Sequence, residues 1–501
     1  MHVLTSTEMK EIDKKTSTDF GITEEVLMEQ AAMAIVGEIQ KDFNKNSHLL
    51  FMVGTGNNGG DALAAARILH NEGYENIEVC IIGDENKGSR LFKKQLNTLK
   101  QFGFLDFFEF NVDFKNHVST ADCIIDGLIG IGLNGNTNDL IKGVIDIINT
   151  FKRGKVLSVD IPSGINANTG EIMGNAILAD KTITFGSVKL GHIFFPGREY
   201  SGTIKVAPLS FPKSLFNISH RELVTPEMVK KLLPKRPKFS QKYDYGNVLI
   251  LAGSSEFPGA SILSAIGAQK VGAGLVKLIT PTPLSSYVLN HEPGIIYKSL
   301  MKDKFSLKDF DLISKELKKA SVIVIGPGLG RSDETMQFVR NVVEYSRVPI
   351  VVDADALYAV DSLSLRKNIV LTPHVGEMKR IVRTDEINIR QNYEYTEKFA
   401  KHKRATIVFK DATTIITNGE RTYFNITGNT ALAKGGSGDL LTGIIAGLVS
   451  QGLDVMEASI VASYLSGRTA EIISDEITEY YTTPLDIAKN LYKAISEVLN
   501  V

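Results

Sequence analysis

Short runs of β-forming residues alternate with helix-length amphipathic segments along this chain of 501 residues. In the first half, the apolar runs lie at residues 49–53, 77–82, 123–125 and 156–159, and helical patterns separate them at 61–71 and 89–102. In the second half, the runs lie at residues 248–251, 322–325, 350–352, 369–371 and 406–409. Such alternation is typical of parallel sheets covered by helices. The sequence therefore predicts an α/β fold in both halves.

The two halves meet in a polar stretch rich in proline. Pro208 and Pro212 follow the last apparent strand of the first half. Further on, Thr225 before Pro226 is typical of a helix start, with threonine as the cap and proline at the first helical position. The length allows two or three domains at roughly 150 to 250 residues each, and the single break favours two. We predict domains over residues 1–212 and 222–501, the second opened by a short helix.

Charge and cysteine content exclude several classes of protein. The chain has 56 basic and 57 acidic residues, which argues against a nucleic-acid or anionic-membrane partner, because such binding needs a basic surface. Cys80 and Cys123 lie in apolar runs, so we expect buried, inert thiols in a reducing compartment. No secretory signal and no run of 18 apolar residues is visible. We therefore expect a cytoplasmic protein with no membrane contact.

Three polar, glycine-bearing loops follow predicted strands of the first half. They begin at Gly54, Asp126 and Asp160. Glycine at a strand-to-helix turn lets backbone amides approach an anion, although a tight turn alone also explains glycine. Asn57, Asn58 and Asp61 add oxygen atoms that suit a ribose, an amide or a hard cation. Ligands of open parallel sheets bind at the carboxyl ends of strands, so the three loops together predict one binding site.

The second half contains the loop of residues 435–439, Gly-Gly-Ser-Gly-Asp, followed by an apolar helical pattern. Backbone amides of such a loop at a helix N-terminus form an anion site. Asp439 in the first helical turn could take a proton from a substrate hydroxyl, which is what phosphoryl transfer to an alcohol requires. A glycine-rich turn with a helix-capping aspartate is the structural alternative. It leaves the three glycines unexplained.

Four further loops of the second half follow predicted strands. They lie at residues 326–330 (GPGLG), 353–357 (DADAL), 372–377 (TPHVGE) and 410–414 (KDATT). The last of these could hold phosphates or ribose. His374 either orients a substrate or has a structural role, and its position at the end of a strand does not decide between the two.

The first-half motifs NNGGD, D-x-x-x-G-x-G-L and VDIPSG together resemble the NAD(P)H-hydrate epimerase family, over about residues 1–212. The resemblance implies a Rossmann-like three-layer sandwich. It also implies contacts to the hydrated nucleotide from Asn57, Asn58, Gly59, Gly60, Asp61, Gly130, Ile131, Gly132, Leu133, Asn134, Gly135, Asn136 and Asp160. Asp160 is the implied acid–base residue at C6 of the damaged ring. Asn58, Asp126 and Ser163 are the implied ligands of a potassium ion. Ala32 and Ala62 stand where the family usually has glycine, so we expect altered helix packing there.

The second-half motifs GGSGD, GPGLG, VDADAL and TPHVGEM resemble the ADP/ATP-dependent NAD(P)H-hydrate dehydratases of the ribokinase-like superfamily, from about Tyr243 onward. This implies a ribokinase-like α/β domain in which Asp439 is catalytic. Hydrate contacts are implied for Ala260, Gly328, His374 and Asp439. Adenine-nucleotide contacts are implied for Lys410, Asp411, Ala412, Thr413, Thr414 and Gly438. Asp411 stands where the family usually has glycine, so its backbone rather than its carboxylate should contact phosphate.

These resemblances predict a bifunctional enzyme that epimerises the R and S hydrates of NADH and NADPH (NADHX and NADPHX). It would dehydrate the S form with ADP or ATP and a magnesium ion. We also expect a homo-oligomer. Two alternatives stay open. The second domain could be a kinase of a small alcohol metabolite, and the first could be a binding module without turnover.

Overall fold

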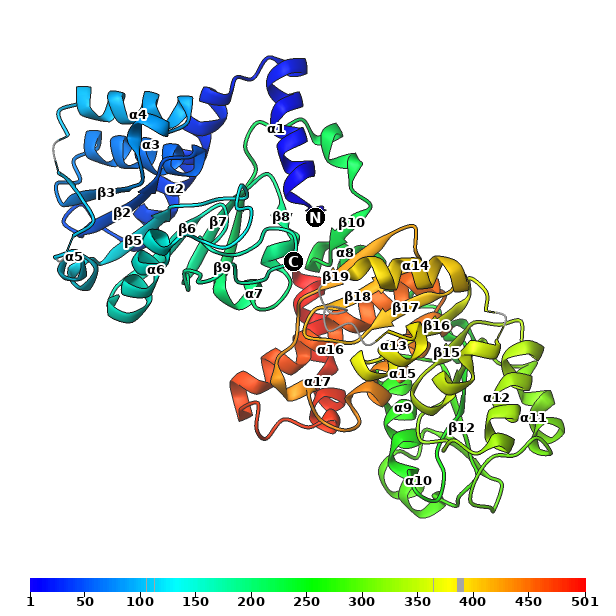
Figure 1. Cartoon of the computed structure of the whole chain (residues 1–501). Coiled ribbons are helices and arrows are strands. Elements are labelled where there is room, and N and C mark those ends of the chain that lie inside the picture. Colours follow the sequence, from blue (N-terminus) through cyan, green and yellow to red (C-terminus); the bar gives the residue numbers. More distant parts are fainter. Residues whose placement is uncertain (105, 112, 364, 385–391) are drawn as a thin grey trace. The chain divides into compact units, whose positions relative to one another are not determined.

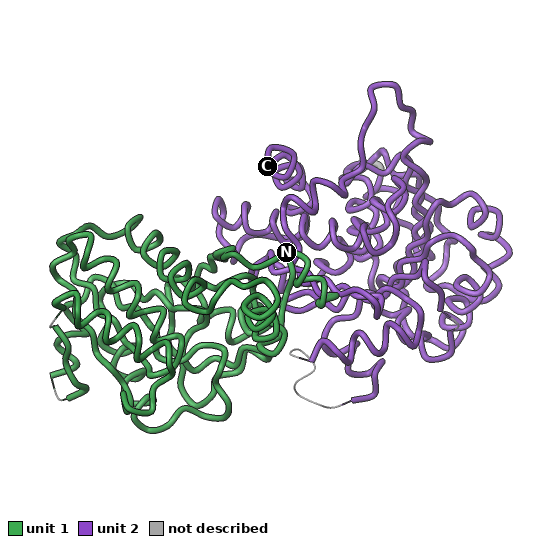
Figure 2. Tube along the Cα trace, turned by 90° about the horizontal axis from the view of Figure 1, so that it is seen from above, with its two compact units in different colours: residues 1–220 green, residues 221–501 purple. Residues whose placement is uncertain are grey.

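In the computed structural model, which describes residues 1–104, 106–111, 113–363, 365–384 and 392–501, the chain forms two compact units. Unit 1 is Met1–His220 and unit 2 is Arg221–Val501 (Figure 2). Each unit contains its own large parallel sheet and its own buried core. The α/β class predicted from the alternating pattern is confirmed.

Unit 1 is built on a sheet of seven strands in the order β4-β3-β2-β5-β6-β7-β9, all parallel. The strands are β2 (Leu49–Gly54), β3 (Ile77–Ile82), β4 (Phe107–Phe108), β5 (Cys123–Gly127), β6 (Lys155–Val159), β7 (Lys181–Phe185) and β9 (Thr203–Ala207). A separate parallel pair joins β1 (Val3–Leu4) to β8 (Val188–Lys189). Cys80 and Cys123 are buried free thiols in β3 and β5, as predicted.

Helices cover both faces of this sheet (Figure 1). The helices of unit 1 are α1 (Ser6–Phe20), α2 (Glu24–Asp42), α3 (Asn57–Asn71), α4 (Arg90–Gln101), α5 (Phe114–Thr120), α6 (Asp139–Phe151) and α7 (Gly197–Tyr200). Alternate residues of β2 divide between two cores, because successive side chains of a strand point to opposite faces. Phe51 packs in a cluster with residues of α2, α3 and α4, and Met52 in a cluster with residues of α5 and α6. Unit 1 is therefore a three-layer sandwich, as expected.

Unit 2 contains a sheet of ten strands in the order β10-β19-β18-β17-β16-β15-β14-β11-β12-β13. The strands are β10 (Arg221–Leu223), β11 (Asn247–Leu251), β12 (Leu275–Thr280), β13 (Ile296–Ser299), β14 (Val322–Ile325), β15 (Ile350–Val352), β16 (Ile369–Leu371), β17 (Thr406–Phe409), β18 (Thr414–Thr417) and β19 (Thr422–Asn425). Only the pairs β17–β18 and β18–β19 are antiparallel within this sheet. The parallel centre places the ends of β11, β14, β15 and β16 at one edge.

The helices of unit 2 are α8 (Pro226–Leu232), α9 (Pro258–Lys270), α10 (Ser285–His291), α11 (Asp309–Leu317), α12 (Asp333–Tyr345), α13 (Val375–Val382), α14 (Tyr393–Lys403), α15 (Ser437–Ser450), α16 (Val455–Ile477) and α17 (Pro484–Asn500). Helices α9 and α15 pack with their backbones in contact. A Cβ atom added at Gly443 would lie 2.0 Å from the carbonyl oxygen of Ser264, and one at Gly267 would lie 2.4 Å from that of Leu440. Only glycine permits this approach.

Two predicted boundaries differ from the structure. Unit 2 opens with strand β10, which pairs with β19, and the predicted short helix α8 comes second. That helix does start as predicted, with the Thr225 side chain accepting the Met228 amide. The first-half helix predicted at 61–71 begins four residues earlier, at Asn57. The asparagine–glycine segment therefore forms the first helical turn rather than a loop.

Two candidate active sites

A cavity of about 590 Å³ opens at the carboxyl ends of the strands of unit 1. Seven of the predicted ligand residues line it, namely Asn57, Asn58, Asp61, Gly130, Ile131, Gly132 and Asp160. They come from segments that follow β2, β5 and β6, which the parallel sheet brings to one edge. Helices α1 and α2 add a wall through Met9, Asp13, Glu24 and Met28. The predicted convergence of three loops on one site matches this arrangement.

The remaining predicted ligand residues of unit 1 do not line this cavity. Gly59 and Gly60 are buried, and a Cβ atom there would lie 1.8 Å from the Gly54 oxygen and 2.7 Å from the Met28 Cε atom respectively. These two glycines therefore serve close packing of helix α3. Residues 133–136 (Leu133, Asn134, Gly135 and Asn136) continue the loop beyond Gly132 with mostly exposed side chains.

Asp160 is held beside a buried lysine that the sequence analysis missed. Lys189, which is fully buried, donates hydrogen bonds of 2.6 Å to Asp160 Oδ1, 2.6 Å to Thr184 Oγ1 and 3.1 Å to the Phe185 oxygen. Burial alone would raise the pKa of Asp160, but the charge and hydrogen bond of Lys189 hold that pKa below its ordinary value. Asp160 also has a φ of 66°, a strained conformation typical of functional positions. Asp160 is therefore an ionised carboxylate fixed at the cavity wall.

His192 fixes the backbone on both sides of this ion pair. Its Nδ1 accepts a hydrogen bond from the Lys189 amide at 3.0 Å, and its Nε2 donates to the Asp160 carbonyl oxygen at 2.9 Å. Burial, followed by the charge of Lys189, lowers the pKa of His192 to about 4. The imidazole is therefore neutral and positions Asp160 and Lys189 without carrying charge. His192 was also missed from the sequence.

Two further carboxyl groups line the same cavity and favour their protonated forms. Burial, and then the charges of Asp160 and Asp13, raise the pKa of Asp61 well above its ordinary value. Burial also raises the pKa of Asp13 to about 6, against the opposing charge of Lys189. Four carboxyl groups thus line the cavity. Asp160 is ionised, Asp13 and Asp61 hold protons more readily than usual, and Glu24 is the fourth. Asp13, on α1, was not predicted.

Asp126 and Ser163, two of the predicted potassium ligands, form a buried oxygen cluster behind the cavity wall. Asp126 Oδ2 accepts from Ser158 Oγ at 2.7 Å and from the Ser163 amide at 2.9 Å, and Asp126 Oδ1 accepts from Ser163 Oγ at 2.5 Å. Burial raises the pKa of Asp126, while these hydrogen bonds oppose the rise. Ser163 Oγ in turn accepts from the Ile129 amide at 2.9 Å.

Asn58, the third predicted ligand, reaches the same loop. A Cβ atom added at Gly130 would lie 3.1 Å from Asn58 Oδ1, so this position favours glycine. The Asn58 Nδ2 atom is buried and has no hydrogen-bond partner among the described residues. Carboxylate, amide and hydroxyl oxygens of this kind match the chemistry of a hard cation. Among the described residues, no group of three or more His, Cys, Asp and Glu side chains forms a transition-metal type site.

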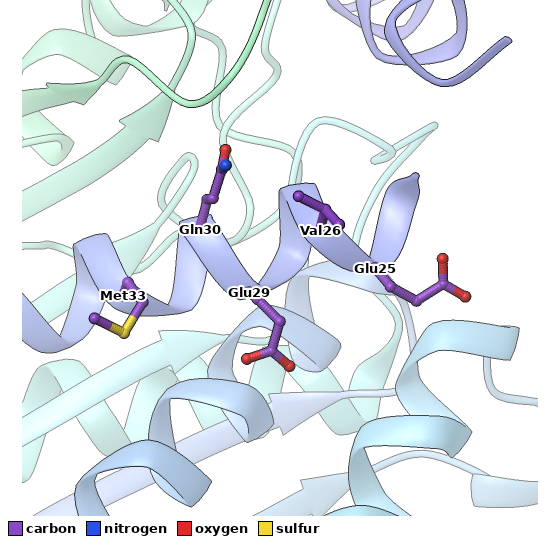
Figure 3. Close-up of a pocket in the computed structure, with 5 residues that line it drawn as sticks. All are labelled: Glu25, Val26, Glu29, Gln30 and Met33. Carbon is purple, nitrogen blue, oxygen red and sulfur yellow. The ribbon is translucent and has the colours of Figure 1, made fainter. Parts of the chain in front are cut away.

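A smaller depression on the outer side of α2 carries none of these groups. Figure 3 shows its lining residues, Glu25, Val26, Glu29, Gln30 and Met33. Glu29 is paired with Arg67 at 2.6 Å, and Gln30 donates to Ser210 Oγ at 2.7 Å. Its polar side chains are thus already bound to neighbouring elements.

The predicted phosphate loop of unit 2 lies at the N-terminus of α15, as its glycine pattern indicated. Gly436 caps the helix with a φ of 97°, a value that favours glycine. A Cβ atom at Gly438 would lie 2.9 Å from Lys410 Nζ. The first turn of this 14-residue helix has no side-chain cap and lies next to a lysine, which is an arrangement that binds anions.

Lys410 is part of a buried polar network under this loop. Its Nζ donates to Asp353 Oδ1 at 2.9 Å, and Thr442 Oγ1 donates to Asp353 Oδ2 at 2.8 Å. Burial alone would lower the pKa of Lys410, but the charges of Asp353 and Glu377 raise it. For Asp353, burial is outweighed by Lys410, so its pKa is lowered. Both groups are therefore charged, and Asp353 is a member of the site that sequence analysis placed only in a loop.

Asp439 lies in the first turn of α15, as predicted. Burial raises its pKa to about 6, and the charge of Asp353 adds to the rise while Lys410 opposes it. Its backbone oxygen accepts a hydrogen bond from Ser264 Oγ of α9 at 3.0 Å. Asp439 is thus a carboxyl group whose proton affinity suits a general base near neutral pH.

The predicted hydrate contacts of unit 2 lie on different elements. Ala260 and Asp439 lie in the first turns of α9 and α15, Gly328 lies in a loop, and His374 precedes α13. Gly328 follows β14, and a Cβ atom there would lie 3.2 Å from the Ala260 Cβ atom, so these two residues are brought together. His374 caps α13, where its Nδ1 accepts the Gly376 amide at 3.0 Å. Its side chain is 60% exposed, and His374 pairs with Lys410 in an isolated parallel bridge. His374 therefore has a structural role, and its Nε2 lies 3.5 Å from Glu377 Oε1.

Asp411, Ala412 and Thr413 form the connection between β17 and β18, and Thr414 begins β18. Asp411 Oδ1 accepts the amide of Ala412 at 2.9 Å. The carboxylate is thus turned onto its own loop. This geometry agrees with a backbone rather than a side-chain contact to phosphate at this position.

The folds and sites together define a class of protein, a two-unit α/β enzyme. Unit 1 has a polar cavity at the carboxyl ends of its parallel strands, and unit 2 has a glycine-rich loop at a helix N-terminus that suits phosphate. Comparisons with known proteins refine the class. A family model described as NAD(P)H-hydrate dehydratase matches residues 248–493, and one described as YjeF-related protein N-terminus matches residues 24–191.

Full-length relatives carry both halves. The bifunctional NAD(P)H-hydrate repair enzyme of Moorella thermoacetica is 35% identical over 494 residues, covering 94% of this chain and 92% of the relative. That of Dictyoglomus turgidum is 33% identical, covering 100% and 99%. A ribokinase-like superfamily protein of Enterococcus faecalis V583 resembles 56% of this chain and 98% of its own (TM-score 0.51, 24% identity), which shows the fold. The chain belongs to the family of bifunctional NAD(P)H-hydrate repair enzymes.

Proposed function

We propose that the chain restores NADH and NADPH from their hydrates in two steps. Unit 1, with its catalytic domain in residues 1–212, interconverts the R and S hydrates. Unit 2, with its catalytic domain in residues 222–501, dehydrates the S hydrate using ADP or ATP and releases AMP or ADP and phosphate. Family membership over the full length supports this reaction pair. The observation that carries the second step is a carboxyl group with a pKa of about 6, Asp439, beside a glycine loop at a helix N-terminus.

In unit 2, Asp439 accepts the proton of the ring hydroxyl while the amides of residues 435–438 hold the phosphoryl group that the hydroxyl oxygen receives. The C6–O bond then breaks and phosphate leaves with its electron pair. Loss of a proton from the neighbouring ring carbon restores the dihydropyridine. Phosphate is a far better leaving group than hydroxide, which is why the step consumes a nucleotide.

The nucleotide and hydrate contacts in unit 2 are assigned by position. Gly438 and the 410–414 loop lie around the helix N-terminus and suit the nucleotide phosphates, with Lys410 supplying positive charge. Ala260 in the first turn of α9, Gly328 after β14 and His374 before α13 suit the hydrate. A magnesium ion would neutralise the nucleotide phosphates at this loop.

In unit 1, Asp160 is the acid–base residue at C6 of the hydrated ring, because it is the ionised carboxylate of the cavity. Asn57, Asn58 and Asp61 with residues 130–132 hold the nucleotide. Asn58, Asp126 and Ser163 would hold a potassium ion, which would join the first turn of α3 and the end of β5 to the segment after β6. Comparison of epimerase rates in potassium and lithium buffers tests this, and equal rates would contradict it.

The direct test of the proposed function uses the whole chain. It is incubated with hydrated NADH and either ADP or ATP, and the return of dihydropyridine absorbance is followed. Recovery with release of free phosphate is expected. Absence of recovery with both nucleotides, or a stable phosphorylated product, would contradict the dehydratase assignment.

The expected homo-oligomer and cytoplasmic location stay predictions. Within the described part of the chain, no helix is both long and apolar enough to cross a bilayer. Sedimentation of the purified chain would settle the number of subunits.

A further inference from the structure

Four carboxyl groups line the cavity of unit 1. Glu24 is paired with Arg90, and the other three influence one another's charge from three different elements. Asp160 follows β6, Asp61 lies in α3 and Asp13 lies in α1. Lys189 binds Asp160 at 2.6 Å. In the described part of the chain, neither Asp13 nor Asp61 forms an ion pair with a lysine or arginine. Lys189, the buried cation at this cavity, therefore pairs with Asp160 and with neither of the other two.

The proposed epimerisation needs two proton-transfer groups in different states, and this inference rests on that proposed function. Carbon C6 carries the hydroxyl and is bonded to N1, so the N1 electron pair can expel the hydroxyl if a proton is supplied. Water must then add to the opposite face and lose a proton. Asp160, held ionised by Lys189, can accept that proton, but it has none to give at the start. A second carboxyl group that begins protonated is required.

We propose that Asp13, presented by α1 into the cavity of Asp160 and Lys189, is that second catalytic residue. Asp13 donates its proton to the leaving hydroxyl, the C6–O bond breaks, and the N1 lone pair forms the N1=C6 bond of an iminium ion. Water adds to C6 on the other face, its electrons returning the N1 pair, and Asp160 takes the released proton. Solvent exchange returns the proton from Asp160 to Asp13. Atoms and charges balance, and the reverse path exchanges the two faces.

Asp13 suits this role better than Asp61. Asp13 and Asp61 are both partly exposed at the cavity, so both can exchange a proton with solvent, and their proton affinities separate them. The pKa of Asp13, about 6, lets this residue both lose and regain a proton near neutral pH. Asp61 has a pKa raised well above the ordinary value, so it stays protonated and can only donate a hydrogen bond. The titratable groups that face Asp13 across the cavity are Lys10, Glu24, Asp61, Asp160 and Lys189.

The test is the variant Asp13→Asn in the full chain, an isosteric change that removes the acid. Interconversion of the R and S hydrates is followed by chromatography above the rate without protein. We expect kcat to fall at least about 100-fold, with the dehydratase rate on the S hydrate unchanged. Glu11→Gln is the matched control, because Glu11 lies on the same helix with its side chain 48% exposed and paired to Lys15. It should leave epimerisation unchanged.

A pH profile separates proton transfer from a structural role. The wild-type rate should decline as Asp13 loses its proton above about pH 6, and this limb should vanish in Asp13→Asn. Asp13→Glu should recover part of the rate and the limb. An unchanged kcat in Asp13→Asn, or a rise in KM alone, would overturn the proposal. If wild-type protein does not epimerise at all, the proposed function of unit 1 fails instead, so the two failures are distinguishable.

Discussion

Lys189 Nζ lies 2.6 Å from Asp160 Oδ1, and both side chains are almost completely buried. Removing a single partner of such a pair leaves an uncompensated charge in the protein interior. The same contact sets the protonation state of the candidate acid–base residue, so stability and chemistry in unit 1 depend on one hydrogen bond.

We predict that Lys189→Met lowers the stability of unit 1 by about 3–5 kcal/mol and abolishes epimerisation. Burial would then raise the pKa of Asp160 without an opposing cation. Denaturant unfolding and the R–S interconversion assay measure the two effects. Asp160→Asn combined with Lys189→Met should cost less stability than the sum of the single changes, because neither charge is left unpaired. Additive effects would show that the two groups are not energetically coupled.

Asp439→Asn should lower the dehydratase kcat by about 10²–10⁴-fold, the usual contribution of a general base. It should leave epimerisation intact, because the epimerase groups lie in unit 1. Both rates are measured on one preparation. Loss of both activities would contradict separate sites, and an unchanged dehydratase rate would remove Asp439 from the mechanism.

The same carboxyl group predicts two opposite responses to pH. As a base, Asp439 must be ionised, so dehydratase kcat/KM should fall as pH drops through about 6. Folding stability responds to pH in the opposite direction. Because the pKa of Asp439 is higher in the folded than in the unfolded chain, its contribution to stability is fully present below the unfolded pKa of 3.8 and is lost as pH rises through about 6. Asp439→Asn should therefore stabilise unit 2 at pH 8 by about 1–3 kcal/mol. Calorimetry at pH 5 and 8 checks this, and a destabilised variant at pH 8 would contradict it.

Gly443→Ala should strongly destabilise unit 2, since the new Cβ atom would lie 2.0 Å from the backbone oxygen of Ser264. We expect a loss of about 3 kcal/mol or more, as for other severe overpacking. Gly259→Ala on α9 is the control, because nothing lies within 4 Å of its Cβ position, and its stability should stay within about 1 kcal/mol of wild type. Equal unfolding midpoints for the two variants would contradict the close helix contact.

The sequence predicted most of the central parallel strands closely, because buried parallel strands are continuous apolar runs. The structure shows β3, β14, β15, β16 and β17 with the predicted bounds. Strands β12, β13, β18 and β19 were not predicted. Their partly exposed or antiparallel positions mix polar with apolar residues, as in β13 with its alternating exposed side chains, and the pattern is then weaker.

Site residues on glycine loops were easier to find than their partners. Asp160 and Asp439 carry local motifs, whereas Lys189 is recognisable only by its burial, which β7, β9 and the short β8 pairing create. Its one sequence signal is that Lys189 and His192 are the only polar side chains in segment 188–194. Asp13 lies among charged residues of an amphipathic helix, so nothing local separates it from a solvent-exposed face. Contacts between residues far apart in the sequence determine both the burial of Lys189 and the position of Asp13 at the cavity.

The contact between α9 and α15 also bears on which molecules unit 2 can accept. Helix α9 begins next to Ala260, and α15 begins with the phosphate loop and Asp439. Because Gly267 and Gly443 let the helix backbones touch, no side chain between the helices can compress or swing to alter their spacing. The spacing between the two helices is therefore fixed by their backbones at this contact. We expect this fixed spacing to limit the size of the hydroxyl compound that fits beside Ala260 and Asp439, so a larger substrate should require a wider helix crossing.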